Sequence, residues 1–215
     1  AAGDVASVED DRSARRPQSA QVESAGGVWT VRPSAATTGA AVIAFGPSGG
    51  AAAYRLRMFR ELGGFCEPFF LYLEDVDLAW RMRLAGYESV WAPGALARHD
   101  YSASAGEGSA FKRRLIARNR IWTLARCLPS EIWRRDRSAI LAFDALAAAY
   151  GAATLDPALW GRLEALVALP LRRREGTIIS RSALVEWEAI DRWLQPPITP
   201  RRLRELRRLT GKLAS

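Results

Sequence analysis

The segment FFLYLEDVDLAWRMRLAGYESVWAP, residues 69–93, constrains the fold more than any other part of this chain. Its first five residues are bulky and apolar, and such a run predicts a buried strand over residues 69–73. Glu74 and Asp75 follow directly, and acidic side chains in a first turn favour a helix because they interact well with the helix dipole. That helix is expected to end at Gly86, with a buried face that consists of Leu78, Met82 and Ala85.

The pattern changes from α/β to all-helical near residue 105. Residues 1–27 are polar and aperiodic and are interpreted as a loop or truncated linker, residues 28–105 as an α/β unit, and residues 106–215 as a helical extension. Strands are expected over 28–31, 51–56, 88–92 and 96–99. Further helices are expected over 57–62, from Ser109 to Pro129, from Ser130, from Asp156-Pro157, over 182–194 and over 201–213.

The charge of the chain is concentrated in its second half. The 215 residues carry 31 Lys and Arg against 23 Asp and Glu, a net charge of +8. Residues 1–111 hold 10 basic and 13 acidic side chains, whereas residues 112–215 hold 21 basic and 10 acidic ones. Hydrophobic residues make up 49%, which excludes a disordered polyelectrolyte and permits one large or two small domains. The basic half could face nucleic acid, anionic lipid or a phosphorylated ligand.

Three carboxylates, Glu74, Asp75 and Asp77, lie where the predicted strand gives way to the predicted helix. Clustered carboxylates at such a point could include a general base, because neighbouring negative charges raise proton affinity. The alternative is that they only cap the helix N-terminus. His99, the single histidine, follows a predicted strand and could be a metal ligand or an ordinary surface or core residue.

The order and spacing of several motifs resemble the second half of the catalytic domain of family 2 glycosyltransferases, in the bacterial rhamnosyltransferase and galactofuranosyltransferase-like branch. The resemblance runs from about Val22 to Leu128 and is densest from Ser48 to Ser104. The motifs that carry it are the Gly-Gly-Phe-x-Glu turn at 63–67, Glu-Asp-Val-Asp-Leu-Ala-Trp-Arg at 74–81 followed by Ala-Gly-Tyr at 85–87, the His-x-x-Ser element at 99–102, and Arg-Asn-Arg at 118–120.

The resemblance implies a GT-A fold and an inverting enzyme that transfers a sugar from a nucleotide diphosphate sugar to a hydroxyl of a glycan or lipid-linked acceptor. Asp75 matches the family's general base, with Glu74 as its motif neighbour. His99 matches the histidine that holds a divalent metal, Mg or Mn, together with an Asp-x-Asp motif. The implied acceptor-binding residues are Asp77, Trp80, Arg81, Gly49 and Gly50.

Two departures from the family pattern affect these expectations. No Asp-x-Asp motif or nucleotide-binding strand precedes the matching run, so the chain resembles the C-terminal portion of a longer enzyme. By itself it is expected to be inactive and to bind nucleotide sugar weakly. Cys66 stands where the family has aspartate, and a thiol does not replace a carboxylate as a hydrogen-bond acceptor. With Cys127 it forms no metal-binding spacing, so neither a zinc site nor a disulfide framework is expected.

The basic half combines arginine with tryptophan on predicted amphipathic helices. No nucleic-acid-binding motif accompanies the charge, so nucleic acid is not expected as a partner. Arginine and tryptophan suit an anionic membrane surface, and a peripheral location at the cytoplasmic face of the cell membrane is predicted. A solvated helical appendage, or a non-catalytic acceptor- or membrane-binding module, is the alternative. The residues expected to face the membrane are Arg113, Arg114, Arg204, Arg207 and Arg208, and Arg118, Arg120 and Arg126 are expected on the same helix as the first two.

Overall fold

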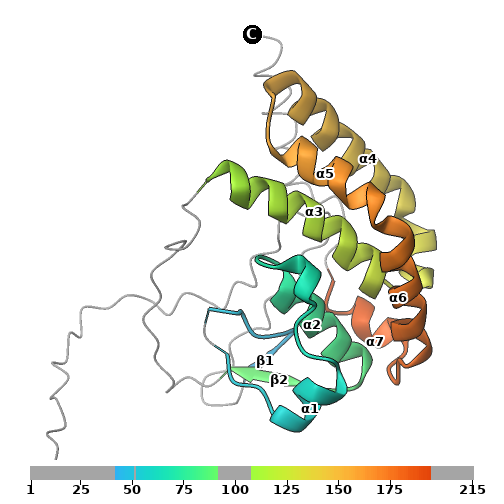
Figure 1. Ribbon diagram of the computed structural model, residues 1–215. Helices are drawn as coiled ribbons and strands as arrows, with labels where there is room; N and C mark the ends of the chain where they lie inside the picture. The colour runs from blue at the N-terminus through green and yellow to red at the C-terminus, as the bar shows by residue number, and fades with distance from the viewer. Residues whose placement is uncertain (1–41, 51, 92–107, 195–215) are drawn as a thin grey trace, which may run out of the picture.

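The computed structural model describes residues 42–50, 52–91 and 108–194 (Figure 1). These residues form two short strands and a set of helices that dominates the molecule. In chain order the elements are β1 (Val42–Ala44), α1 (Leu56–Glu61), the 3-10 helix η1 (Glu67–Phe69), α2 (Glu74–Leu84), β2 (Ser89–Trp91), α3 (Ala110–Cys127), α4 (Ser130–Thr154), α5 (Ala158–Val167), α6 (Leu169–Arg181) and α7 (Trp187–Asp191).

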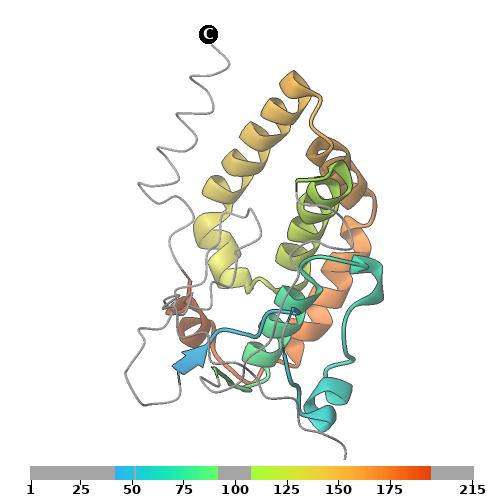
Figure 2. The same ribbon diagram turned by 90° about the vertical axis from the view of Figure 1, so that its left-hand side faces the viewer.

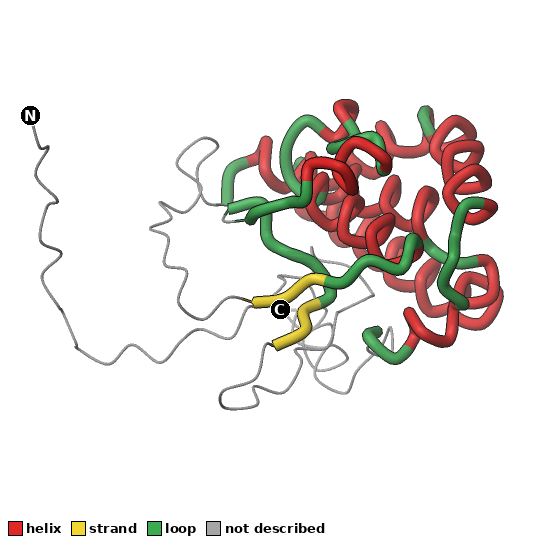
Figure 3. The backbone as a smooth tube through the Cα atoms, turned by 90° about the horizontal axis from the view of Figure 1, so that it is seen from below, coloured by secondary structure: helices red, strands yellow, loops and turns green. Residues whose placement is uncertain are grey.

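The two strands pair antiparallel at one edge of the helical body (Figure 3). Val42 lies opposite Trp91 and Ala44 opposite Ser89. β2 confirms the strand expected over 88–92, whereas β1 was not anticipated by the sequence pattern. A pair of short strands is too small a part of a sheet to test the predicted GT-A fold, which stays a prediction.

The strands expected over 51–56 and 69–73 are wrong. Residues 52–55 have no regular structure, and residues 67–73 form η1 and a loop. Phe70, Tyr72 and Leu73 all have positive φ, a conformation that no β-strand contains. The strand expected over 28–31 and that over 96–99 lie outside the described residues, as does the boundary near residue 105.

Several helix boundaries follow the sequence signals. α1 ends before Gly63 and Gly64, and α2 before Gly86; all three glycines have the positive φ that terminates a helix. The Ser109 hydroxyl accepts a hydrogen bond from the Lys112 N–H and caps α3. Asp156 does the same for the N–H of Ala158 at the start of α5.

The helix expected over 182–194 is wrong in extent, because α6 runs to Arg181 and α7 covers only Trp187–Asp191. The chain between them turns back to α2. There the N–H groups of Leu184 and Val185 donate to the Leu84 carbonyl at 2.8 and 3.1 Å. This contact satisfies a carbonyl at the C-terminal end of α2 and ties the C-terminal helices to the first half of the chain.

One hydrophobic core joins the two halves. Phe45 and Trp80 from the first half pack edge to face, with ring centroids 5.4 Å apart. The same cluster includes apolar residues of the helical half, namely Cys127, Ile132, Ile140, Ile190 and Leu194. The helices after residue 108 therefore supply part of the hydrophobic core that covers Phe45 and Trp80.

α5 and α6 follow one another along α3 (Figures 1 and 2) and approach its backbone closely through two glycines. A Cβ on Gly161 would overlap the carbonyl oxygen of Arg114, and a Cβ on Gly176 that of Ala125. Between these points Ala165 is fully buried, and its carbonyl accepts a hydrogen bond from Trp122 Nε1 at 3.2 Å. Small residues thus set the spacing between α3 and the α5–α6 pair.

We expect Gly161→Ala to destabilise the protein. Replacing glycine by alanine inside a helix ordinarily stabilises by about 1 kcal/mol, but here the overlap with Arg114 should reverse the sign and cost about 1–3 kcal/mol. Chemical denaturation measures the difference. Gly151→Ala is the matched control, because the nearest atom to its Cβ would be the Leu159 Cβ at 3.2 Å and the nearest backbone atom the Leu159 nitrogen at 3.6 Å. A stabilised Gly161→Ala protein would show that the helices are not in backbone contact there.

Candidate functional site

The loop that leads into α2 holds an unusual backbone conformation. Phe70, Tyr72 and Leu73 have φ values of 62°, 67° and 69°, each in the left-handed region that non-glycine residues seldom adopt. Leu73 immediately precedes Glu74, the first residue of α2. The backbone conformation of this loop therefore determines where Glu74 and Asp75 lie.

Asn119 and Arg118 of α3 hold this loop in place. The Asn119 side chain is fully buried, and its Nδ2 lies within 2.7–3.0 Å of the carbonyl oxygens of Phe69, Leu71 and Tyr72. Arg118 donates to the Pro68 and Phe69 carbonyls and, through Nε, to Asn119 Oδ1. The sequence singled out Arg-Asn-Arg at 118–120 as a family resemblance, but gave no signal that it positions the loop before α2.

Asp75 is brought next to the glycine turn at residues 48–50. Its Oδ2 accepts a hydrogen bond from the Gly49 N–H at 2.7 Å, and its Oδ1 accepts one from the Val76 N–H at 2.8 Å. A Cβ on Gly49 would lie 3.3 Å from Asp75 Oδ2, so glycine permits this close approach. Gly50 instead donates to the Ser48 hydroxyl at 3.5 Å. The structure thus unites two predicted site residues, Asp75 and Gly49, that are 26 positions apart.

Two further oxygens near Asp75 have no hydrogen-bond partner among the described residues. One is Glu74 Oε2 and the other is the Tyr54 hydroxyl, and both atoms are buried. Burial raises the pKa of Glu74, and the charge of Asp75 adds to the rise. Burial also raises the pKa of Tyr54 to about 12, with smaller contributions from Asp75 and Glu74. Unsatisfied buried oxygens beside a carboxylate are groups that a hydroxyl-rich ligand could satisfy. The sequence pattern did not identify Tyr54.

Asp77 does not join Asp75; it lies inside the protein. The carboxylate is fully buried and pairs with Arg81 at 2.7 Å and with Arg126 of α3 at 2.7 Å. Arg81 also donates to the Leu62 and Gly64 carbonyls at 2.5 and 2.8 Å. Trp80 is buried in the core against Phe45. The described contacts of Asp77, Trp80 and Arg81 are within the fold, and their contact with an acceptor stays a prediction.

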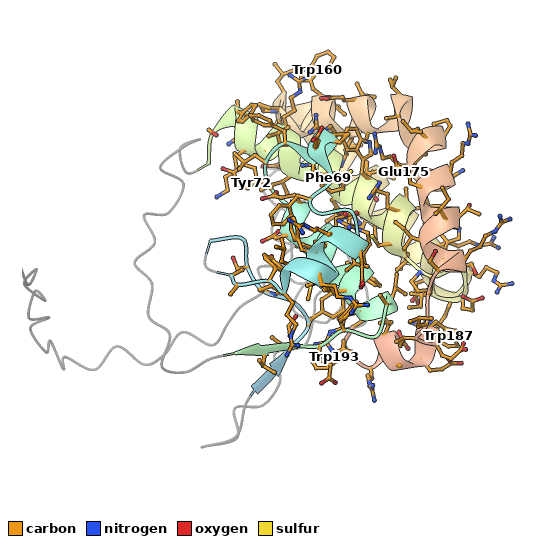
Figure 4. All side chains as sticks on the ribbon, turned by 60° about the horizontal axis from the view of Figure 1, so that its bottom comes forward. Phe69, Tyr72, Trp160, Glu175, Trp187 and Trp193 are labelled. Atoms are coloured by element: carbon orange, nitrogen blue, oxygen red, sulfur yellow. The ribbon has the colours of Figure 1, made fainter. Side chains whose placement is uncertain are left out.

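A carboxylate from α6 lies near Cys66, the position where the family pattern has aspartate. Arg172 Nη1 lies 3.8 Å from the Cys66 Sγ and 2.7 Å from Glu175, which also pairs with Arg126 (Figure 4 labels Glu175). Burial raises the pKa of the Cys66 thiol, which favours its neutral form. Glu175 therefore supplies the counter-charge of Arg172 beside a neutral side chain at position 66, and it shares Arg126 with Asp77.

The described residues neither contain nor complete the predicted metal site. His99 lies outside them, and within residues 42–50, 52–91 and 108–194 there is no cluster of three side chains able to hold a metal ion. The ligation of a divalent metal by His99 therefore stays a prediction.

The three arginines that the sequence places on the same helix as Arg113 and Arg114 do lie on α3, but they are not exposed. Arg118, Arg120 and Arg126 are buried and pair with Glu164, Asp144 and Asp77. They point inward because α5, α4 and α2 supply carboxylates on the covered sides of α3.

Arg113 and Arg114 are half exposed, and both are paired. Arg113 lies 3.4 Å from Asp156, and Arg114 2.9 Å from Glu164. Arg204, Arg207 and Arg208 lie outside the described residues. Among the helices that the structure describes, none combines the length and the apolar character required to cross a membrane.

Part of the chain is homologous to a known glycosyltransferase. Over 63 residues, 29% of this chain, it is 41% identical to N-acetylglucosaminyl-diphospho-decaprenol L-rhamnosyltransferase from two strains of Mycobacterium tuberculosis. The chain spans about a fifth of the length of these curated relatives. No family model and no solved structure matches the chain. The homologous stretch supports a glycosyltransferase-related role.

Neutralising Asp77 and neutralising Asp75 should have different effects on stability. Asp77→Asn leaves Arg81 buried without a counter-charge and leaves Arg126 with Glu175 alone, and it should cost about 3–5 kcal/mol. Asp75→Asn, the matched control in the same helix turn, removes only charge-assisted hydrogen bonds to two backbone N–H groups and should cost about 1 kcal/mol. Urea denaturation of both variants measures the difference. An equal loss of unfolding free energy in the two variants would contradict the conclusion that Asp77, and not Asp75, is required for the fold.

Glu74→Gln should stabilise the protein at neutral pH. Because the pKa of Glu74 is raised above its usual 4.5 in the folded chain, ionised Glu74 disfavours folding, and stability falls as pH rises from 4.5 through the raised pKa. Thermal unfolding between pH 4 and 8 should therefore show a higher melting temperature for Glu74→Gln at pH 7 and none of this advantage at pH 4. Glu67→Gln, which makes the same chemical change at an exposed position of η1, is the control and should leave the melting temperature unchanged. An advantage independent of pH would refute the interpretation.

Proposed function

We propose that this chain forms the acceptor side of an inverting glycosyltransferase, which transfers a sugar from a nucleotide diphosphate sugar to a saccharide carried on a lipid diphosphate. The observation that carries the proposal is the Asp75 carboxylate, held by the Gly49 N–H in a chain that is partly homologous to a rhamnosyltransferase. The decaprenol-linked acceptor in the relative's name supports the lipid-linked class of acceptor.

Asp75 would act as the general base. Each of its carboxylate oxygens accepts one backbone N–H, which fixes the orientation of the group and leaves lone pairs free for an acceptor hydroxyl. As the hydroxyl oxygen attacks the anomeric carbon of the donor, its proton passes to Asp75. Attack from the face opposite the leaving group inverts the anomeric centre.

The groups around Asp75 would position the acceptor. Glu74 and the Tyr54 hydroxyl each have an unsatisfied buried oxygen, and sugar hydroxyls can both donate and accept hydrogen bonds. Asn119 would be a positioning residue that does not touch the acceptor, because it holds the loop from which α2 begins. A divalent metal, held by His99 and an Asp-x-Asp motif, would offset the charge of the departing diphosphate.

The alternative is a non-catalytic module that binds the acceptor without transferring sugar. The departure at Cys66 favours it, since the family pattern has a carboxylate there. The two proposals differ in whether sugar transfer depends on Asp75.

Asp75→Asn should lower the rate of sugar transfer at least about 100-fold, because general-base catalysis contributes roughly 100- to 10,000-fold. The assay uses the protein as its gene encodes it, N-acetylglucosaminyl-diphospho-polyprenol as acceptor, and thymidine and uridine diphosphate sugars as donors, with rhamnose first. Glu188→Gln, which changes an exposed carboxylate on α7 outside the site, is the control and should leave the rate unchanged. Transfer that survives Asp75→Asn would favour the non-catalytic alternative.

A further inference from the structure

The side of α5 and α6 that faces away from α3 carries a row of exposed apolar residues. We call it the outer stripe; its members are Trp160, Leu163, Val167, Leu171 and Ile178. They recur at intervals of three, four or seven residues, which places them on one face of successive helices. Trp160 is 64% exposed and Val167 85% exposed. Figure 4 shows Trp160 projecting outward from α5. The opposite side of these helices, at Gly161, Ala165 and Gly176, contacts α3.

The outer stripe continues toward the candidate site. Arg114 of α3 lines a shallow hollow with Trp160, Leu163, Glu164 and Val167. One turn before Arg114, the Phe111 ring packs edge to face against Phe70 at 6.3 Å, and Phe70 is 75% exposed. Phe70 belongs to the loop that leads into Glu74 and Asp75. Exposed apolar side chains therefore extend from the outer stripe to the loop that positions the proposed base.

The charge beside the outer stripe is positive and unpaired. Arg173, Arg174 and Arg181 are exposed, and within the described part of the chain none of them has an acidic partner. Within α6, Arg174 follows Leu171 by three residues and Arg181 follows Ile178 by three, so they lie on the same side as the stripe. The nearby carboxylates of Glu164 and Glu175 are already paired with arginines.

We propose that the outer stripe, with Phe70 and Phe111, docks on the surface of an anionic lipid bilayer. Helices that lie in a bilayer surface combine an apolar face containing tryptophan with flanking cations that attract anionic headgroups. The unpaired arginines favour lipid over an apolar protein partner, because a purely apolar interface would leave these charges without counter-charge. The orientation of Asp75 toward a lipid-linked acceptor rests on the proposed function; the docking itself does not.

Vesicle binding tests the proposal. The wild-type protein should co-sediment with vesicles that contain phosphatidylglycerol at low salt, and binding should weaken as sodium chloride rises. Val167→Asp should weaken binding at least tenfold. Leu184→Asp is the matched control, since Leu184 is 81% exposed but lies after the end of α6 and off the stripe, and it should bind as the wild type does. Arg174→Gln combined with Arg181→Gln should reduce the salt dependence.

A second readout locates the contact. Brominated lipids quench tryptophans that enter the bilayer surface, so they should quench the wild-type fluorescence and quench Trp160→Phe much less. Equal binding of Val167→Asp and the wild type, or equal losses for Val167→Asp and Leu184→Asp, would overturn the proposal. A wild-type dimer that Val167→Asp dissociates, without vesicle binding, would assign the stripe to a second copy of the chain instead.

The sugar-transfer assay separates this proposal from the proposed function. With a water-soluble short-chain acceptor, Val167→Asp should retain transfer, whereas with the acceptor embedded in anionic vesicles its rate should fall at least tenfold. Transfer that depends on Asp75 together with absent vesicle binding would overturn the docking alone. Vesicle binding that depends on Val167 without Asp75-dependent transfer would overturn the proposed function alone.

Discussion

The buried ion pairs of Asp77 hold the described parts of the chain together. Its carboxylate, which is wholly inside the protein, joins Arg81 of its own helix to Arg126 of α3. Arg81 reaches the carbonyls after α1, and Arg126 reaches Glu175 of α6. A buried guanidinium without a counter-charge is very costly, so each arginine requires its partner in place. The Glu-Asp-Val-Asp motif thus contains Asp75, which is available for chemistry, and Asp77, whose contacts stabilise the fold.

Some arginines of the basic half are buried in ion pairs and others are exposed, and the sequence did not distinguish the two groups. A repeated pattern of arginine along a helix looks like a solvated face, because long cationic side chains are usually exposed. In α3 several of these side chains are instead covered by later helices, which supply Glu164 and Asp144 as partners. Exposed cations without an acidic partner among the described residues include three on α6, Arg173, Arg174 and Arg181, which the charge count could not locate.

Signals that act within a few residues predicted the structure well, and signals that depend on distant contacts did not. Glycines at 63, 64 and 86 marked helix ends and Asp156-Pro157 marked a helix start, since φ and capping are local properties. The bulky run at 69–73 was interpreted as a strand, but Asn119 holds it as a loop through three carbonyls. The sequence identified Asp75 and Gly49 separately, and only the fold shows that they touch; Tyr54 carried no pattern at all.

The close approach of α5 and α6 to α3 also limits how this protein can vary in length. Gly161 and Gly176 each meet the α3 backbone, and the chain between them is almost continuously helical. Inserting or deleting one residue there would turn one glycine away from α3 by about 100°, because a helix has 3.6 residues per turn. A side chain with a Cβ would then face α3, and the outer stripe would be split between two directions. Substitutions on the outer side are compatible with this geometry, whereas a change in the number of residues between the two glycines is not.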